Sequence, residues 1–283
     1  MSDHSRRRAK KLVYKIQWVG YNGKDHSWEP AAKITGLVPQ MKEEYDEMHE
    51  LYCEQRQLYG FDEFNQGSFA TYATWNEQFL FRIPESIPSA EAAPLMCAGA
   101  AVYSALRSSG VQWYHRVGVL SLGGLGHLAV QYAAKMGCHV TVCSHSSGKE
   151  EAARNLGASE FQVMGDTSPS SRAVDCLLLT GAQKPDWFQA LSLVRRGGVI
   201  SAITVDSSEL RCSYGDILMN ATRVQGSLPA APNVQREMLS FSALHEIKPI
   251  IEIFPFTEDG IDEAMEKLRQ GKMRYRGVLA MDA

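Results

Sequence analysis

The chain has 283 residues, a hydrophobic fraction of 45%, a charged fraction of 22% and a formal net charge of −3 at pH 7. These values are ordinary for a globular protein, and the nearly balanced charge argues against a protein that coats nucleic acid or a membrane surface. No apolar run approaches the roughly 18 residues that span a bilayer, and no signal-peptide core is present. The six cysteines form no Cys-x-x-Cys pair and are too sparse for a disulfide scaffold. We therefore expect a cytoplasmic protein of about two domains with no membrane partner.

The first fifty or so residues combine a basic run, a strand pattern, a turn and a helical pattern. The run RRRAKK covers residues 6–11, and the apparent strand LVYKIQWV covers residues 12–19. The pieces GYNG and HSWEP and a charged helical pattern over residues 37–53 follow. Strand, turn, Trp-Glu-Pro and closing helix together resemble a chromodomain of the kind that retroelement integrases carry, over residues 12–49.

In chromodomains an aromatic cage holds a methyl-lysine, because ring faces attract a quaternary ammonium. The resemblance gives cage roles to Trp18 and Tyr21, and it implies a histone peptide as partner and the nucleus as compartment. The family's first strand, which carries a third aromatic residue, has no counterpart before Leu12. The alternative interpretation is therefore a partial barrel fragment that binds no peptide.

Two elements are expected between this segment and the centre of the chain. Residues 67–73, GSFATYA, alternate as a strand does, and residues 79–84 follow. A helix is expected to open with Ser89 as its cap and an early acid, and to continue through the small residues PLMCAGAAVY at 94–103. A lone cysteine in such an alanine-rich helix, here Cys97, is typical of a core position.

The stretch over residues 116–149 organises the rest of the chain. A strand pattern at 116–120 is followed by the turn SLGGLG at 121–126, a helical pattern that ends at Gly137, and a second strand pattern at 139–143. This order is typical of a dinucleotide-binding unit, in which the turn and the helix N-terminus hold the pyrophosphate. The alternative is a structural glycine turn without a ligand.

The positions of this turn have different expected roles. Gly123 lets the backbone approach the pyrophosphate, and Gly126 lets the helix pack closely against the strand. The helix N-terminus adds amide donors, so that the expected cofactor-binding residues are Gly123, Gly124 and Leu125. Ser121 stands where the fingerprint has its first glycine, and a serine fits that corner if its φ stays negative.

The loop after the second strand favours NADP over NAD. An NAD-binding protein usually carries an acidic residue near the end of this strand, where it accepts from the ribose 2′-hydroxyl. Here the sequence SHSSGK follows the strand, and the first carboxylate is that of Glu150. Hydroxyls and a lysine suit a 2′-phosphate that a carboxylate would repel, so the expected contacts are Ser144, His145, Ser146 and Lys149. The alternative is a solvated loop with helix-capping serines.

The blocks FRIPESIPSAEAAPLMCAGAAVYSAL and SLGGLGHLAVQYAAKMG resemble the zinc-dependent medium-chain alcohol dehydrogenases of the cinnamyl alcohol dehydrogenase-like branch, over residues 67–281. The resemblance implies an α/β fold with a doubly wound parallel (Rossmann) sheet, NADPH- and zinc-dependent reduction of aldehydes, including aromatic ones, to alcohols, and a homodimer. It makes Cys97 a zinc ligand. It also places four residues beside the nicotinamide, for which strand-end turn chemistry is the alternative: Thr180, Gly226, Ser227 and Leu228.

The family takes its other zinc ligands from an N-terminal cysteine block and a Gly-His-Glu block, and neither block occurs in this sequence. A catalytic zinc needs three protein ligands, and one thiolate does not hold it. Three hypotheses stay open: an NADP- and zinc-dependent alcohol dehydrogenase, a catalytically inactive NADP-binding remnant, and a chromatin-binding fusion product. The expected domains are a partial chromodomain-like segment at 1–55, a remnant of a GroES-like catalytic domain at 56–90, an NADP-binding Rossmann domain at 91–230, and a segment at 231–283 that returns towards the catalytic domain.

Overall fold

The computed structural model describes residues 13–17, 26–30, 52, 69–70, 72–75, 77–165, 173–182, 185–205 and 209–281. The chain divides into two compact units, Met1–Ala73 and Thr74–Ala283. None of the helices in the described ranges has both the length and the apolarity that crossing a bilayer requires.

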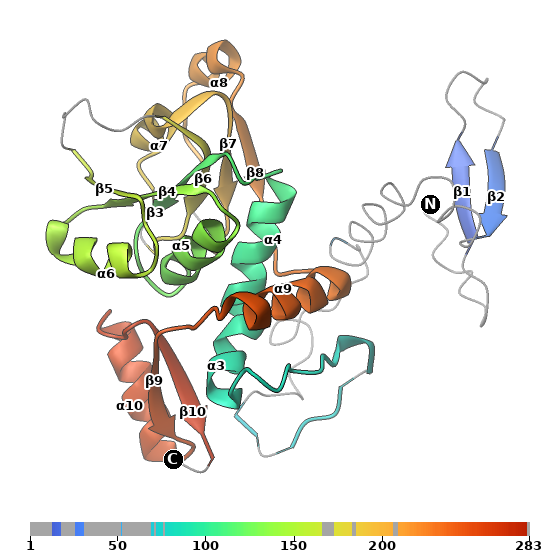
Figure 1. Ribbon diagram of the computed structural model, residues 1–283, viewed down its shortest axis with the longest axis vertical. Helices are drawn as coiled ribbons and strands as arrows, with labels where there is room; N and C mark the ends of the chain where they lie inside the picture. The colour runs from blue at the N-terminus through green and yellow to red at the C-terminus, as the bar shows by residue number, and fades with distance from the viewer. Residues whose placement is uncertain are drawn as a thin grey trace. The chain divides into compact units, whose positions relative to one another are not determined.

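The described part of the first unit is mainly an antiparallel hairpin of β1 (Val13–Gln17) and β2 (His26–Pro30) (Figure 1). The strand expected over residues 12–19 is thereby confirmed at 13–17, and HSWEP forms its partner. The helix expected over residues 37–53 lies outside the described residues, apart from residue 52.

Six parallel strands form the sheet of the second unit, in the order β5-β4-β3-β6-β7-β8. Their bounds are β3 (Arg116–Leu120), β4 (His139–Ser144), β5 (Glu160–Val163), β6 (Val174–Leu179), β7 (Val194–Ala202) and β8 (Arg223–Gly226). The chain runs outward from β3 to β5, crosses back to β6, and runs outward again to β8 (Figure 1). The expected doubly wound α/β fold is confirmed, and its switch point, where such sheets bind ligands, lies between β3 and β6.

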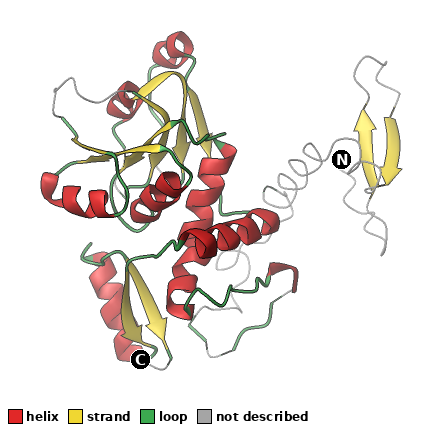
Figure 2. Ribbon diagram, viewed as in Figure 1, coloured by secondary structure: helices red, strands yellow, loops and turns green. Residues whose placement is uncertain are grey.

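Helices cover both faces of this sheet (Figure 2). The helices that follow strands are α5 (Gly126–Lys135), the short η4 (Ser147–Lys149) with α6 (Glu150–Asn155), α7 (Trp187–Leu193) and α8 (Tyr214–Asn220). Neighbouring residues of β6 belong to different cores: Leu177 packs with Trp187, and Leu178 belongs to the larger cluster that contains Leu128 and Tyr132 of α5. Successive strand side chains point to opposite faces, so α5 and α7 pack against opposite faces of the sheet.

A continuous helical rod leads into the sheet, formed by α3 (Ser89–Pro94), the π turn η3 (Leu95–Gly99) and α4 (Ala100–Ser108). The helix α9 (Pro232–His245) contacts η3 and α4. The helix expected from Ser89 onward is confirmed, but the serine cap is wrong. Pro88 occupies the N-cap position with extended backbone, and Ser89 is already inside the first turn without a capping hydrogen bond. Proline has no side-chain oxygen that could accept from the first N–H groups, so the helix starts without a side-chain cap.

The C-terminal segment forms a small layer of its own. The strands β9 (Ile251–Pro255) and β10 (Arg276–Ala280) pair in parallel, and α10 (Glu258–Arg269) connects them. The start of α10 is capped by Thr257, whose hydroxyl oxygen accepts from the Gly260 N–H at 3.2 Å. Both strands contact α3, so this layer is anchored to the rod. We refer to β9, α10 and β10 together as the C-terminal layer.

The strand expected over residues 67–73 is wrong for the residues that the structure describes there. Residues 69–70 form a bend, residues 72–75 have no regular structure, and η2 (Glu77–Phe79) with irregular residues 80–84 follows. A strand exists only where a neighbour receives its backbone hydrogen bonds, and an alternating sequence does not supply that neighbour.

Candidate cofactor site

The turn between β3 and α5 lies at the switch point of the sheet. A methyl group on Gly126 would lie 2.1 Å from the Ser121 carbonyl oxygen, so only glycine allows α5 to start this close to the end of β3. A methyl group on Gly123, in contrast, would meet no atom within 4 Å. The second glycine of the fingerprint thus faces open space and the third is closed in, which is the arrangement that a pyrophosphate over the turn requires.

Ser121 differs from its expectation. Its φ is +82°, not negative. A backbone hydrogen bond holds the residue in this conformation: the Ser121 N–H donates to the Cys143 carbonyl at 2.8 Å. A serine therefore occupies a left-handed position that glycine adopts without strain, and the condition of a negative φ is not met.

We expect Ser121→Gly to stabilise the protein. Glycine adopts the left-handed conformation without the strain of about 1–2 kcal/mol that serine has there. The greater conformational freedom of glycine in the unfolded chain lowers the stability by about 0.5–1 kcal/mol. A net gain of about 0.5–1 kcal/mol should appear as a higher midpoint in urea unfolding at an unchanged slope. An equal or lower midpoint would show that the serine side chain contributes more than the strain costs.

Thr180 joins the two strands that flank the switch point. Its hydroxyl donates to the carbonyls of Leu120 and Ser121, with oxygen–oxygen distances of 2.8 and 2.7 Å, and its N–H donates to Leu120 at 3.2 Å. The side chain is buried. Thr180 therefore holds the glycine turn against the end of β6, and its expected place beside the nicotinamide stays a prediction.

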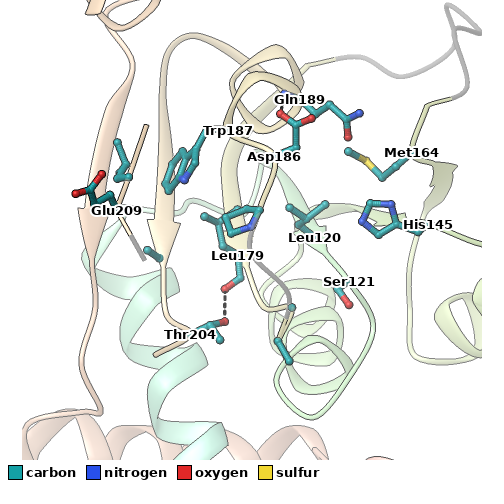
Figure 3. A pocket seen from close by; sticks show the side chains of 15 residues that line it. Leu120, Ser121, His145, Met164, Leu179, Asp186, Trp187, Gln189, Thr204 and Glu209 are labelled. Atoms are coloured by element: carbon teal, nitrogen blue, oxygen red, sulfur yellow. Dashed lines mark hydrogen bonds between the residues drawn. The ribbon is translucent and has the colours of Figure 1, made fainter. Parts of the chain in front are cut away.

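A cleft of about 260 Å³ opens at the carboxyl ends of the strands (Figure 3). Figure 3 shows His145 and Met164 on one side of it, Trp187 and Glu209 on the other, and Leu179 between them. Among the expected cofactor residues, His145 lines this cleft. Its walls are mainly apolar with a few polar groups, as is usual for a site that takes a flat organic ring.

The loop after β4 reaches the glycine turn through Lys149. The Lys149 ammonium donates to the Leu122 carbonyl at 2.9 Å. His145 and Ser146 are exposed beside it, and Ser144 is buried at the end of β4. The structure therefore brings the expected 2′-phosphate residues and the glycine turn to one edge of the sheet.

Two residues that the sequence analysis did not single out also contact the turn. The Arg276 side chain of β10 lies so close to Gly124 that a methyl group there would meet two of its atoms at 3.2 Å. His127, in the first turn of α5, is fully buried, and its Nδ1 lies 2.9 Å from the Gly123 carbonyl oxygen. Arg276 lies 150 residues beyond Gly126 in the sequence, so only the tertiary structure could have identified it.

The protonation state of His127 follows from its surroundings. Burial lowers the pKa of His127 to about 4, and the nearby Arg276 charge acts in the same direction. The imidazole is therefore neutral at pH 7. Its Nε2 accepts from the Ile250 N–H at 3.1 Å, so the proton is on Nδ1, which donates to Gly123.

The residues expected at the nicotinamide end follow β8. The Ser227 N–H donates to the Ala202 carbonyl at 3.1 Å, which carries the pairing of β7 and β8 one residue further. Gly226 and Leu228 flank it, and Leu228 is partly exposed. These residues lie at the same carboxyl edge as the glycine turn, on the far side of β7.

The described residues do not fit a catalytic zinc. Cys97 is an exposed free thiol in η3. Nowhere in the described ranges do three His, Cys, Asp or Glu side chains come together as a metal site requires. The cage residues Trp18 and Tyr21 lie outside the described residues.

Two family models match this chain. The model of the zinc-binding dehydrogenases matches residues 124–243, and the model of the Chromo (chromatin organisation modifier) domain matches residues 2–48. The first begins inside the glycine turn and continues through α5 and the strands β4 to β8 into α9, and the second covers the hairpin of the first unit.

Curated relatives and solved structures agree with the first model. The chain is 33% identical over 216 residues to the probable formaldehyde dehydrogenase AdhA of Bacillus subtilis, a match to 75% of this chain and 61% of that protein. It is 31% identical over 236 residues to an alcohol dehydrogenase of Moraxella sp., a match to 81% of this chain and 69% of that protein. The chain thus spans about three fifths to two thirds of the length of these relatives.

Among solved structures, a cinnamyl alcohol dehydrogenase from Sorghum bicolor superposes with a TM-score of 0.66 at 33% identity, over 70% of this chain and 57% of that one. The structure of CAD from Helicobacter pylori complexed with NADP(H) also gives a TM-score of 0.66, at 30% identity over 73% of this chain and 59% of that one.

Proposed function

The chain belongs to the zinc-dependent medium-chain alcohol dehydrogenases, and on that basis we propose that it binds NADP(H) across the carboxyl ends of β3, β4 and β6. The observation that carries this proposal is the glycine turn: Gly123 faces open space, the Arg276 side chain lies against Gly124, and the Lys149 ammonium donates to the Leu122 carbonyl. Backbone amides at the start of α5 and the Arg276 charge favour a phosphate over the turn, and Lys149 adds a positive charge at the side of the loop after β4. The solved relative with NADP(H) supports the same class of cofactor.

Each part of the cofactor has candidate contacts in the chain. The pyrophosphate would lie over Gly123, with the amides of Gly124 and Leu125 as donors, and the 2′-phosphate near Lys149 and the hydroxyls of the loop after β4. The cleft beside His145 has the size and lining for the adenine end. Gly226, Ser227 and Leu228 would line the nicotinamide end. When bound, NADPH supplies a hydride.

We expect Lys149→Met to lower the affinity for NADPH about tenfold and to leave the affinity for NADH within about twofold, because only NADPH has the 2′-phosphate that a charge-assisted bond would hold. Fluorescence titration of the purified chain with each nucleotide measures both constants. Methionine keeps most of the apolar length of the lysine side chain.

Lys135→Met is the matched control, since Lys135 is exposed in the last turn of α5, away from the glycine turn. This variant should bind both nucleotides as the unchanged chain does. Equal losses for NADPH and NADH in Lys149→Met would assign Lys149 to the shared pyrophosphate, and no loss would exclude it from the site.

A second candidate function is oxidoreduction of an alcohol or aldehyde with NADP(H). The relatives favour it, since they are named as alcohol and formaldehyde dehydrogenases. The family reaction uses a zinc ion, and the described residues do not assemble its ligands. The test is NADPH oxidation with a panel of aromatic aldehydes and added zinc. Turnover that a chelator abolishes would establish the enzyme, while NADPH binding without turnover would leave a cofactor-binding protein.

A third candidate concerns the first unit. Residues 2–48 match the Chromo domain, and this match supports binding of a methyl-lysine histone peptide at Trp18 and Tyr21. Titration with a trimethylated histone peptide tests it, and Trp18→Ala should abolish the affinity. Affinity that persists in this variant would exclude the cage.

The domain boundaries, the homodimer and the cytoplasmic or nuclear compartment stay predictions. Sedimentation velocity of the purified chain tests the homodimer. The location of a tagged full chain in cells tests the compartment.

A further inference from the structure

Two side chains of α5 hold the segment that leads into the C-terminal layer. The Gln131 amide nitrogen donates to the Lys248 carbonyl at 2.9 Å, and the Gln131 amide oxygen accepts from the Lys248 N–H at 3.1 Å. One helical turn earlier, His127 Nε2 accepts from the Ile250 N–H at 3.1 Å. Residues four apart lie on the same side of a helix, so His127 and Gln131 together replace the strand neighbour that this extended segment lacks.

The same segment also holds β10. The Ile250 carbonyl accepts from the N–H groups of Tyr275 and Arg276, each at 3.2 Å. The Tyr275 ring stacks on the His127 imidazole, with ring centroids 5.1 Å apart and planes at 25°. Besides the packing of β10 on α3, Arg276 is therefore placed by contacts that lead back to α5.

These contacts end at the glycine turn. His127 contacts the turn through Nδ1, which donates to the Gly123 carbonyl, and the Arg276 side chain lies against Gly124. The two side chains that contact Gly123 and Gly124 are thus both bonded to, or placed by, one short segment, Lys248 to Ile250.

We infer that His127 and Gln131 form a clamp, the α5 clamp, that couples docking of the C-terminal layer to nucleotide binding at the glycine turn. The inference rests on the proposed binding of NADP(H). Docking of the layer brings the Arg276 charge to the turn, and a phosphate on the turn attracts that charge and so favours the docked layer. By linkage, docking of the layer raises the nucleotide affinity by the same factor by which the bound nucleotide favours docking. A change that loosens the layer therefore weakens nucleotide binding. Gln131 is a positioning residue, since its side-chain bonds go to Lys248 and to its own helix and none goes to the turn.

The test is Gln131→Met, which removes both bonds to Lys248 but keeps the length and the helix propensity of the side chain. Two quantities are measured: the dissociation constant of NADPH and the hydrogen exchange of the β9 and β10 amides, with and without NADPH. We expect the amides to exchange about tenfold faster in the free variant and NADPH to bind about threefold to tenfold more weakly.

Gln270→Met is the matched control, because Gln270 belongs to the same layer but its side chain bonds to Glu266 of α10, at 2.7 Å. It should change neither quantity.

A double-mutant cycle tests the coupling itself. Arg276→Met should weaken NADPH binding about tenfold in the unchanged chain and clearly less in the Gln131→Met background, although the two side chains have no bond to each other. Additive effects, or exchange in β9 and β10 that ignores Gln131→Met, would overturn the inference. A chain that binds no NADPH at all would overturn the proposed function instead, and the exchange of the free protein would then still report whether the α5 clamp holds the layer.

Discussion

The Gly126→Ala variant is expected to lose about 3 kcal/mol of its free energy of unfolding, a large cost for one methyl group. The added carbon would lie 2.1 Å from the Ser121 carbonyl oxygen and 3.1 Å from the Ser121 carbonyl carbon and from the Thr180 hydroxyl. Two of these atoms belong to the backbone, so no side-chain rotation relieves the overlap. The helix α5 must move away from β3, which disturbs the core that Leu128 and Tyr132 form. Urea unfolding at pH 7.5 measures the loss.

Gly123→Ala is the matched control, since the same methyl group there meets nothing within 4 Å. We expect its unfolding free energy to stay within about 0.5 kcal/mol of the unchanged chain. Its NADPH affinity should fall about tenfold or more, because the methyl group occupies the place where the pyrophosphate approaches the backbone. Two equally destabilised variants would contradict the geometry of the turn, and unchanged NADPH affinity in Gly123→Ala would contradict the proposed phosphate site.

Acid should destabilise the chain through His127. Burial lowers its pKa from 6.5 to about 4 in the folded state, so the unfolded chain takes up a proton first as the pH falls. The contribution of the neutral imidazole to the free energy of unfolding is complete above pH 6.5. Below that pH it declines by about 1.4 kcal/mol per pH unit. By pH 4 the accumulated loss is about 3 kcal/mol. Denaturant unfolding at several pH values between 4 and 7.5 measures this slope.

His127→Asn separates this contribution from those of the carboxylates. Asparagine can still donate to the Gly123 carbonyl but no longer accepts from Ile250, so the variant should be less stable at pH 7.5 by about 1–2 kcal/mol. It has no imidazole to titrate, so its stability should fall less steeply, and the two curves should cross between about pH 5 and 6, with the variant the more stable protein at pH 4. Parallel curves would mean that another group carries the acid sensitivity.

The sequence predicted the Rossmann part of the fold well, for a physical reason. A buried parallel strand is a short apolar run, and a helix that packs on it shows a 3.6-residue pattern, so 116–120 and the helix ending at Gly137 are visible locally. The secondary structure of residues outside this pattern was harder to predict. The strand β9 was not expected and the strand at 67–73 was expected wrongly, because each depends on whether a neighbour is present to receive its hydrogen bonds.

The same division applies to the candidate site. The glycine spacing and the loop after β4 are consecutive in the chain, and a turn of six residues determines which amides face a phosphate. The sequence could therefore name Gly123, the start of α5 and Lys149 without the fold. It could not give the φ of Ser121, which depends on the bond to Cys143 in the next strand.

By itself, then, the sequence determined the family, the doubly wound sheet and the local parts of the cofactor site, because these follow from short-range patterns. Only the tertiary structure decided that Arg276 lies against Gly124, that His127 is neutral, and that Gln131 holds Lys248. Each of these depends on a segment more than a hundred residues away along the chain, brought to α5 by the parallel pairing of β9 and β10 and by their packing on α3. Contacts at that separation leave no periodic trace in the sequence, and so they appear only once the chain is folded.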